Sequence, residues 1–379
     1  MEFGISLSEL KRTLDAINKV ISNKTSLPIM QYALVLRTGD NTLSFTGASA
    51  EAQLTLSCEV AITENDDFKA LCIDSKRIAS LLTTLNEQPL RIRLDHQKNS
   101  VRLTYDQGHF DIAAEPADGY VEPIKTTDPK VRFEIEGTEL LNAMRLATVS
   151  TNSDDLRPAF SAVCLDVKDD GIVVVATNGE SLWRKVFDYG TPFLKEGSEP
   201  MQMLVYGRHI TAMAYFDAMD RIGFEGNESY WKMSGGNATY VCRRVEGRYP
   251  NYNSVIRENP YSITVNRVAL LSVLRRVSIL APASSNSVRL VYKDGKIAIS
   301  TEDIDFSNKA EETLGVEDCN MPATFNICFK GNVLARLLGT TNEGRVRLTF
   351  ADPSRSINVL EDTPNSTLLM LLMPLLDNL

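Results

Sequence analysis

The stretch FGISLSELKRTL, residues 3–14, recurs as FEIEGTELLNAM at residues 133–144 and as ITVNRVALLSVL at residues 263–274. The apolar positions Ile5, Leu10 and Leu14 return 130 residues later, and again after a further 130 residues. Each copy predicts a short alternating strand that leads into a helix, because its apolar residues then recur at three- and four-residue steps. A repeat of this length predicts three copies of one structural unit.

Two further landmarks repeat in the same order. The stretches ALVLRTGDNTLSF from residue 33, AVCLDVKDDGIVV from residue 162 and SVRLVYKDGKIAI from residue 287 each predict two strands joined by a tight turn. The stretches starting at residues 71, 203 and 325 each predict a strand followed by a helix. We therefore expect an α+β fold of three tandem copies, each with two helices packed on antiparallel sheets. The expected copies span residues 1–128, 129–258 and 259–379.

The composition is that of a globular protein. Of the 379 residues, 43% are apolar and 23% are charged. The six cysteines form no C-x-x-C pair, and the first residues, MEFGISLSEL, lack the basic-then-apolar pattern of a signal sequence, so we expect a cytoplasmic protein. The apolar run at residues 367–376 is about half of the roughly 20 residues that a membrane span needs, which predicts no membrane partner.

Charge is unevenly distributed between helices and the rest of the chain. The net charge is −9, which would repel nucleic acid if it were spread evenly. The six expected helices, residues 7–20, 75–85, 137–149, 207–217, 267–280 and 330–339, hold twelve Lys and Arg against four Asp and Glu. They carry +8, so the remainder carries −17. If the six helices lie on one face of the protein, that face is basic and would attract the phosphates of a nucleic acid. The alternative is that the charged residues are ordinary solvent-exposed residues on helix surfaces.

A search for catalytic motifs finds little. The three histidines are not spaced like metal ligands, and the chain has no P-loop, G-x-G-x-x-G or G-x-S-x-G motif. The acidic stretch at residues 302–305 lacks the glycine of a calcium loop, which favours a solvated or interface strand. We expect no enzyme, no metal and no cofactor. A site assembled from residues distant in the sequence is the alternative.

Four stretches together resemble one family. They are VEGRYPNY at residues 245–252, NKTSLPIM at 23–30, GASAEAQL at 47–54 and the C-terminal LLMLLMPLL at 368–376. In this order on a triple repeat, the chain resembles the bacterial sliding clamps, the beta subunits of DNA polymerase III. The resemblance covers the whole chain. It implies three clamp domains per chain, and a head-to-tail homodimer that closes into a ring with helices inside and sheets outside.

The resemblance also implies partners. Double-stranded DNA would pass through the ring and be held independently of its sequence, so that the clamp slides and tethers the replicative polymerase. The alpha subunit of DNA polymerase III, the clamp loader, other polymerases and repair proteins would bind through short hydrophobic motifs. Such motifs suit an apolar groove with a few polar markers.

That groove is a peptide-binding cleft between the second and third domains. Carried over residue by residue, the resemblance implies that it is lined by Phe160, Thr177, Gly179, Leu182, Pro250, Val255, Asn326, Phe329, Leu371, Leu372, Met373, Pro374 and Leu375. Glu180 and Ser181 replace a His-Arg pair that is common in the family, and Ser254 replaces a basic residue. These departures predict a weaker need for acidic groups in the bound motif.

The resemblance implies two further sets of residues. For the dimer interface it points to Phe110, Ile279 and Leu280, and to Lys76 and Arg77 facing the acidic residues Glu302, Asp303 and Asp305. For DNA it points to Lys24 and Arg157, and the basic helices add Arg145, Arg208 and Arg275. A protein-binding scaffold and an enzyme are the rival functions. Three copies disfavour the eukaryotic type of clamp, which has two domains per chain.

Overall fold

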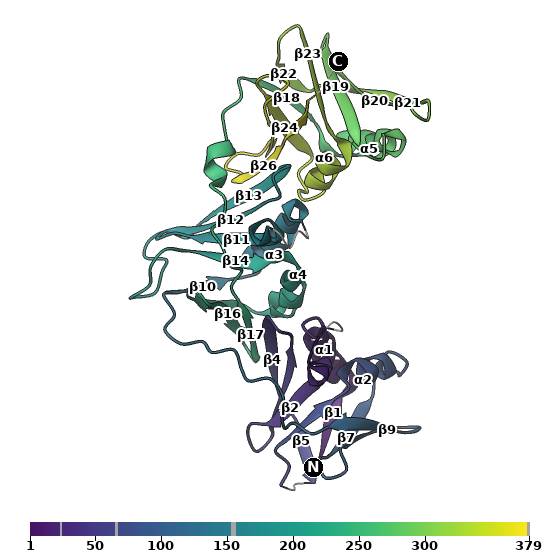
Figure 1. Cartoon of the computed structure of the whole chain (residues 1–379), viewed down its shortest axis with the longest axis vertical. Helices are drawn as coiled ribbons and strands as arrows, with labels where there is room; N and C mark the ends of the chain where they lie inside the picture. The colour runs from purple at the N-terminus through teal and green to yellow at the C-terminus, as the bar shows by residue number, and fades with distance from the viewer. Residues whose placement is uncertain (23–24, 65–66, 153–156, 377–379) are drawn as a thin grey trace. The chain divides into compact units, whose positions relative to one another are not determined.

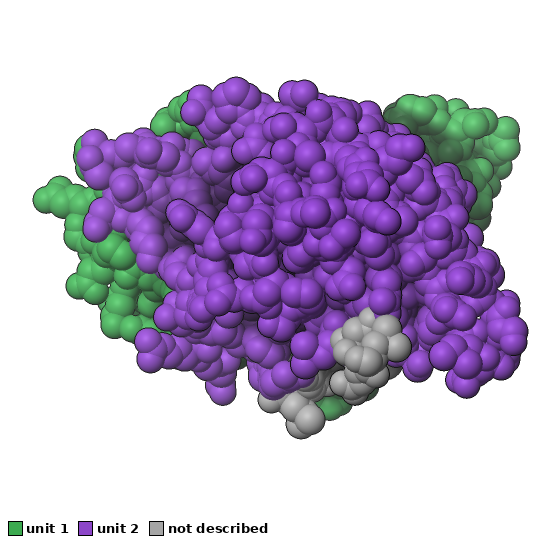
Figure 2. All heavy atoms as spheres, turned by 90° about the horizontal axis from the view of Figure 1, so that it is seen from above, with its two compact units in different colours: residues 1–141, 192–203, 208–244 green, residues 142–191, 204–207, 245–379 purple. Residues whose placement is uncertain are grey.

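The computed structural model describes residues 1–22, 25–64, 67–152 and 157–376. The chain forms two compact units, coloured separately in Figure 2. Unit 1 comprises Met1–Leu141, Pro192–Met203 and Arg208–Arg244, and unit 2 comprises Asn142–Thr191, Leu204–Gly207 and Val245–Leu379. Among the described helices, none is long and apolar enough to cross a membrane.

Unit 1 is built on one sheet of thirteen strands, all of whose pairings are antiparallel. In spatial order the strands are β10 (Val131–Glu136), β15 (Arg221–Gly226), β16 (Tyr230–Gly235), β17 (Ala238–Arg243), β4 (Ala52–Glu59), β3 (Thr42–Ala48), β2 (Ala33–Arg37), β6 (Ala70–Ile73), β9 (Gly108–Glu115), β8 (Ser100–Tyr105), β7 (Pro89–Asp95), β1 (Glu2–Ser6) and β5 (Ala61–Glu64).

Two smaller antiparallel sheets account for the other strands. The nine-stranded sheet has the order β14 (Met201–Tyr206), β11 (Ala162–Val167), β12 (Gly171–Thr177), β13 (Ser181–Asp188), β26 (Leu368–Leu372), β25 (Ile357–Glu361), β24 (Arg345–Phe350), β18 (Tyr261–Asn266) and β22 (Asp318–Asn320). The five-stranded sheet has the order β21 (Asn308–Gly315), β20 (Lys296–Asp303), β19 (Ser287–Lys293), β23 (Thr324–Lys330) and β27 (Pro374–Leu375).

The helices are short and amphipathic. The α-helices are α1 (Leu7–Asn18), α2 (Ser75–Leu82), α3 (Glu139–Ala147), α4 (Gly207–Ile210), α5 (Arg267–Val277) and α6 (Gly331–Leu338). The 3-10 helices are η1 (Pro28–Gln31), η2 (Thr148–Ser150), η3 (Pro158–Ser161), η4 (Thr211–Ala218), η5 (Tyr252–Val255) and η6 (Ser278–Leu280). In Figure 1, α1 and α2 lie side by side, and α5 lies beside α6 in the same manner.

The repeated landmarks appear in the structure, which confirms the α+β fold. The strand-to-helix landmark forms β1–α1, β10–α3 and β18–α5. Two of these helices begin in the same way: Ser6 Oγ accepts from the Glu9 N–H at 3.2 Å, and Asn266 Oδ1 accepts from the Ala269 N–H at 3.0 Å. These caps satisfy N–H groups that have no partner within the first turn of a helix. The three expected hairpins form β2–β3, β11–β12 and β19–β20.

One expected helix has a different geometry. The sequence predicts a single α-helix at residues 207–217, but only Gly207–Ile210 is α-helical and Thr211–Ala218 is a 3-10 helix. Thr211, Tyr215 and Phe216 are weak helix formers. The segment is instead held by packing against α1, where the Arg12 guanidinium lies 5.3 Å from the centre of the Tyr215 ring. Tertiary contacts therefore decide the geometry here.

A close approach fixes the position of α1 on the sheet of unit 1. A Cβ atom built on Gly47, in β3, would lie 2.5 Å from the Ile17 carbonyl oxygen, closer than side chains and backbone approach in folded proteins. Leu14 and Ile17 of this helix are fully buried. Only glycine allows α1 to pack at this distance.

The compact units group the chain differently from the three expected copies. Strand β4 of the first copy pairs with β17 of the second, and β13 of the second copy pairs with β26 of the third. Each of these pairings makes a continuous sheet from parts of two copies. The copy boundaries after residues 128 and 258 stay a prediction.

Candidate peptide-binding cleft and partner surfaces

A cavity of about 170 Å³ lies in unit 2 beside the turn between β12 and β13. Eight of the thirteen residues expected in the peptide-binding cleft line it: Phe160, Thr177, Gly179, Leu182, Pro250, Val255, Leu371 and Met373. The structure adds Ser181, Asn251 and Tyr252 to this lining. Segments distant in the sequence therefore meet at one small, mostly apolar hollow.

The remaining five residues have other environments. Leu372 and Phe329 are buried core residues. Pro374 pairs with Phe329, and Leu375 with Cys328, in the ladder between β27 and β23. Asn326 is exposed on β23 and does not line the cavity. The strand pairing of the C-terminal residues therefore ends the cavity at Met373.

The floor of the cleft is a packed apolar cluster. It includes Leu182, Leu204, Val245 and Leu371, with Tyr249 and Tyr252 from the VEGRYPNY stretch. The Tyr249 hydroxyl donates to the Val175 carbonyl at 3.4 Å and accepts from the Thr177 N–H at 3.0 Å. This tyrosine ties the stretch to the end of β12.

Tyr252, the second tyrosine of this stretch, also forms a buried hydrogen bond. The Tyr252 hydroxyl donates to Asp166 Oδ2 at 2.7 Å, and both groups are buried. Burial raises the pKa of Tyr252, and the hydrogen bond and charge of Asp166 raise it further. The hydroxyl is therefore protonated at neutral pH and stays a donor. It holds the segment that carries Pro250 and Val255 at the rim of the cleft.

Polar contacts close one side of the cleft. Lys330 Nζ donates to Glu180 Oε1 at 2.5 Å, and the Met373 N–H donates to the Glu180 carbonyl at 2.8 Å. The Ser181 hydroxyl is buried and donates to Ser150 Oγ at 3.0 Å. The exposed Ser254 hydroxyl donates to the Asn251 carbonyl at 2.7 Å. The three residues that depart from the family pattern thus contact the protein itself.

A second cavity in unit 2 lies on its helices. It has a volume of about 640 Å³ and is lined by Arg275 of α5 and Arg336 of α6, together with Asn286 and Asn332. Arg275 is an expected DNA contact, whereas Arg336 is not among the residues predicted from the sequence. Guanidinium and amide groups of this kind commonly contact phosphates. Arg276, the neighbour of Arg275, instead forms an ion pair with Glu312 at 2.5 Å.

The other expected DNA contacts are dispersed. The Arg157 guanidinium lies 4.9 Å from the centre of the Phe160 ring. Arg208 forms an ion pair with Glu51 at 2.6 Å in unit 1. Arg145 lies in the last turn of α3. Lys24 lies outside the described residues.

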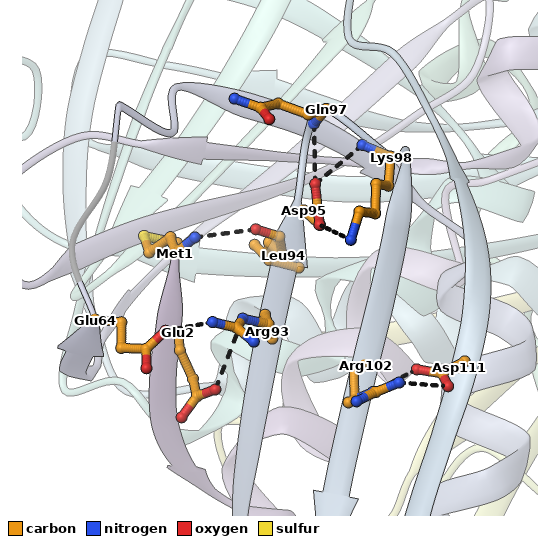
Figure 3. Close-up of polar contacts among 10 residues, drawn as sticks. All are labelled: Met1, Glu2, Glu64, Arg93, Leu94, Asp95, Gln97, Lys98, Arg102 and Asp111. Atoms are coloured by element: carbon orange, nitrogen blue, oxygen red, sulfur yellow. Dashed lines mark hydrogen bonds and ion pairs between the residues drawn. The ribbon is translucent and has the colours of Figure 1, made fainter.

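One expected interface region lies on β8 and β9 of unit 1. Figure 3 shows polar contacts of β7, β8 and β9 in this part of the sheet, among them the two bonds from Arg102 to Asp111, at 2.6 and 2.9 Å. Phe110 stacks on Tyr105 with 5.1 Å between ring centres. Strand β6 pairs with β9 only at Glu115 and Ala114. In the part of the chain that the structure describes, the rest of that edge of β9 has no strand beside it.

The other expected interface region, in unit 2, has a sheet edge and exposed apolar side chains. Strand β21 is an edge strand of its sheet. Ile279 is 78% and Leu280 is 37% exposed, and at the turn between β20 and β21 Ile304 is 85% and Phe306 is 76% exposed. Ile279 and Leu280 are expected interface residues. Ile304 and Phe306 are not among the predicted residues, because they alternate with acidic residues in the sequence. Exposed large apolar side chains of this kind are candidates for a contact site.

The remaining expected interface residues have local partners. Lys76 Nζ donates to the Ile21 carbonyl at 3.2 Å, and Arg77 lies 3.3 Å from Asp74. Asp303 accepts from the Phe306 N–H at 3.2 Å, so it shapes the turn that carries Ile304 and Phe306. Glu302 and Asp305 are exposed. No group of three or more His, Cys, Asp or Glu is placed to hold a metal ion within the described residues.

Comparisons with known proteins agree with one another. Residues 1–122 match the family model of the DNA polymerase III beta subunit N-terminal domain, and residues 255–376 match that of its C-terminal domain. The beta sliding clamp of Pseudomonas putida is 22% identical over 381 aligned residues, covering 99% of this chain and 100% of the relative. That of Escherichia coli is also 22% identical, with the same coverage.

Solved structures give the same result for the fold. The crystal structure of the DNA polymerase III beta subunit from Pseudomonas aeruginosa superposes with a TM-score of 0.88 at 21% identity, covering 99% of this chain and all of the other. The beta subunit from Thermotoga maritima superposes with a TM-score of 0.88 at 17% identity, covering 99% of each chain. At these identities, the superpositions establish a shared fold.

Proposed function

The chain belongs to the bacterial sliding clamp family, the beta subunits of DNA polymerase III, and on this premise we propose how it encloses DNA and recruits partners. As a member of this family it is a processivity factor without a catalytic site of its own. Two copies associate head to tail into a ring around duplex DNA, and the ring holds the polymerase on its template.

The observation that carries this proposal is the pair of open sheet edges. Unpaired edge strands readily form hydrogen bonds with another strand. If the open edge of β9 in one copy joins β21 of a second copy, the contact is between different patches, and two identical contacts close a ring of two copies. The apolar residues Ile279, Leu280, Ile304 and Phe306 then lose their exposure against the Phe110 region of the second copy.

Enclosure explains how an acidic protein holds DNA. A ring of two chains, each with a net charge of −9, does not need tight phosphate contacts, because it cannot leave a closed circle of DNA. Arg275 and Arg336, with Arg145, Arg157, Arg208 and Lys24 as further candidates, supply a weak attraction that does not depend on base sequence. Weak, screened contacts leave the ring free to slide.

The cleft in unit 2 is the docking site for partner motifs. Its small apolar hollow accepts one or two aliphatic side chains of an extended peptide, and Gly179 and Met373 are among the residues that line it. Partners that carry such motifs are the polymerase alpha subunit, the clamp loader, other polymerases and repair proteins. Because the Glu180 carboxylate faces Lys330, the cleft favours apolar over acidic motifs. These partners place the protein in the cytoplasm.

The test is primer extension on a long circular template with the polymerase and clamp loader of the same organism. We expect the clamp to lengthen the product made in one binding event, and we expect the quadruple variant Ile279→Ala, Leu280→Ala, Ile304→Ala, Phe306→Ala to abolish this effect. Product lengths that are equal with and without the protein would contradict the proposal. A scaffold that never encloses DNA would also leave the product length unchanged.

A further inference from the structure

A cavity of about 630 Å³ lies in unit 1 beside the turn between β3 and β4. This turn carries Ser49–Glu51, and the cavity is also lined by Arg208 and His209 of α4 and by Tyr240 and Arg243 of β17. None of the contacts proposed above for the dimer or for the peptide cleft explains this cavity.

The cavity is the counterpart of the peptide-binding cleft in the internal repeat. The Tyr249 hydroxyl donates to the Val175 carbonyl at the cleft, and the Tyr120 hydroxyl donates to the Thr46 carbonyl at 3.1 Å. Both residues of the pair are shifted by 129 positions, from 120 to 249 and from 46 to 175. One hydrogen bond therefore anchors the same segment in two copies.

The strands around the two cavities also correspond. After the turn, β4 pairs with β17 with Ala52 opposite Cys242, and β13 pairs with β26 with Ser181 opposite Leu372. The carboxylate just before each strand forms an ion pair with the following copy: Glu51 with Arg208 at 2.6 Å, and Glu180 with Lys330 at 2.5 Å. Unit 1 thus holds a second cavity of the same construction.

Two differences between the corresponding residues of the two copies change what this cavity can bind. Leu182 on the floor of the cleft corresponds to Gln53, whose amide donates to the Glu122 carbonyl and accepts from the Ile124 N–H, both at 2.9 Å. Met373 at the rim corresponds to Arg243, whose Nε donates to the Ala50 carbonyl at 3.3 Å. A guanidinium thus replaces a thioether at the rim.

Three polar groups of the cavity wall have capacity left for a ligand. Tyr240 is fully buried, and its hydroxyl has no hydrogen-bond partner among the residues that the structure describes. Within the same residues, neither Lys19 Nζ nor the Arg243 guanidinium has a carboxylate within ion-pair distance. A buried hydroxyl without a partner is costly, and a bound acceptor would remove that cost. The two cations favour an anionic group.

We propose that the cavity in unit 1 is a second peptide-binding site, which takes a short acidic segment of a partner protein. A carboxylate of the segment lies at Arg243 and Lys19, and an aliphatic side chain lies against Val20, Met30 and Ala212. The inference rests on the proposal that the cleft in unit 2 binds peptides, because the shared construction identifies the ligand class.

The probe is a short fluorescein-labelled peptide of alternating leucine and aspartate, whose binding is measured by fluorescence anisotropy. The same peptide with asparagine in place of aspartate is the control ligand. We expect the acidic peptide to bind about tenfold more tightly than the neutral one, because charge-assisted hydrogen bonds are the stronger kind. The substitution Arg243→Met, which places the residue of the cleft at this position, should remove that difference, and Lys19→Gln should reduce it.

The cleft variant Met373→Ala distinguishes the two sites. It should weaken binding of an all-apolar peptide and leave the acidic peptide unaffected. The inference is overturned if neither labelled peptide binds the unchanged protein, if Arg243→Met leaves the preference for aspartate intact, or if Met373→Ala abolishes binding of the acidic peptide. If the apolar peptide fails to bind while the acidic peptide binds through Arg243, the cleft proposal fails and the cavity in unit 1 stands.

Discussion

The hydroxyl of Tyr252 and the carboxylate of Asp166 form a buried hydrogen bond of 2.7 Å that holds the rim of the cleft to its sheet. We expect Tyr252→Phe to lower the free energy of unfolding by about 1–3 kcal/mol, because the buried Asp166 carboxylate loses one donor and keeps Lys168 Nζ, at 2.9 Å, as another. It should also weaken binding of an apolar peptide. Urea unfolding and peptide titration measure the two effects. Tyr261→Phe, in strand β18, is the control and should change neither.

Ile304 and Phe306 define a second prediction, for the dimer. Replacing both with Ser should remove about 2 kcal/mol of apolar burial each, which weakens each of the two contacts of the ring by a factor on the order of a thousand. Light scattering over a dilution series measures this change. Val268, exposed on α5, is the control position, and Val268→Ser should leave the dimer intact. A dimer that survives the double substitution would show that the turn between β20 and β21 lies outside the interface.

Gly47 provides a test of the packing of α1. A Cβ at this position meets the Ile17 carbonyl at 2.5 Å, so Gly47→Ala should destabilise the protein by about 1–3 kcal/mol. Gly344 has open space around it and is the matched control. Thermal unfolding of both variants compares them directly. Equal melting temperatures would mean that α1 moves away from β3 without loss.

The contact of Glu51 with Arg208 and His209 makes stability depend on pH. Burial acts to raise the pKa of Glu51, but Arg208 and His209 outweigh it and the pKa lies below the usual value. Burial lowers the pKa of His209, and Arg208 lowers it further against the effect of Glu51. Both groups therefore bind protons more readily in the unfolded chain.

The sign of the effect follows from these directions. A lowered pKa in the folded state stabilises the protein above the unfolded pKa, and this contribution is lost as the pH falls through the folded pKa. Stability should thus decline below a pH of about 6.5, where an unfolded histidine begins to bind its proton, and further below about 4.5. Urea unfolding between neutral and acid pH measures the decline. The variant His209→Gln should flatten its first part, and an unchanged profile would rule out His209 as its source.

Much of the fold could be predicted from the sequence because the repeat supplies the same pattern three times. The apolar spacing of residues 3–14 and the turn residues near 40, 170 and 294 depend only on local geometry, so they give the helices and hairpins. The α-helix predicted at residues 207–217 is only partly correct, because contacts with α1 decide the geometry of this segment. The pairing of β4 with β17 and of β13 with β26 joins distant segments, and local patterns do not contain it.

The candidate cleft was predictable in part. The resemblance identified the residues around Gly179 and Met373, which the structure brings together at one cavity. It did not identify Tyr252 as a wall of that cavity, because this role depends on its bond to Asp166. Ile304 and Phe306 were missed for a different reason: exposure depends on which face of a turn reaches solvent. Arg243 was missed because its significance appears only when β17 is compared with β26.

The ring itself is tested most directly by loading the protein on a circular plasmid, washing with concentrated salt, and then cutting the plasmid at a single site. Concentrated salt screens surface attraction, so only enclosure should hold the protein on the circle. The account predicts that the protein remains bound through the wash and is released when the circle is cut. Release during the wash, or retention that is unchanged by the cut, would contradict it.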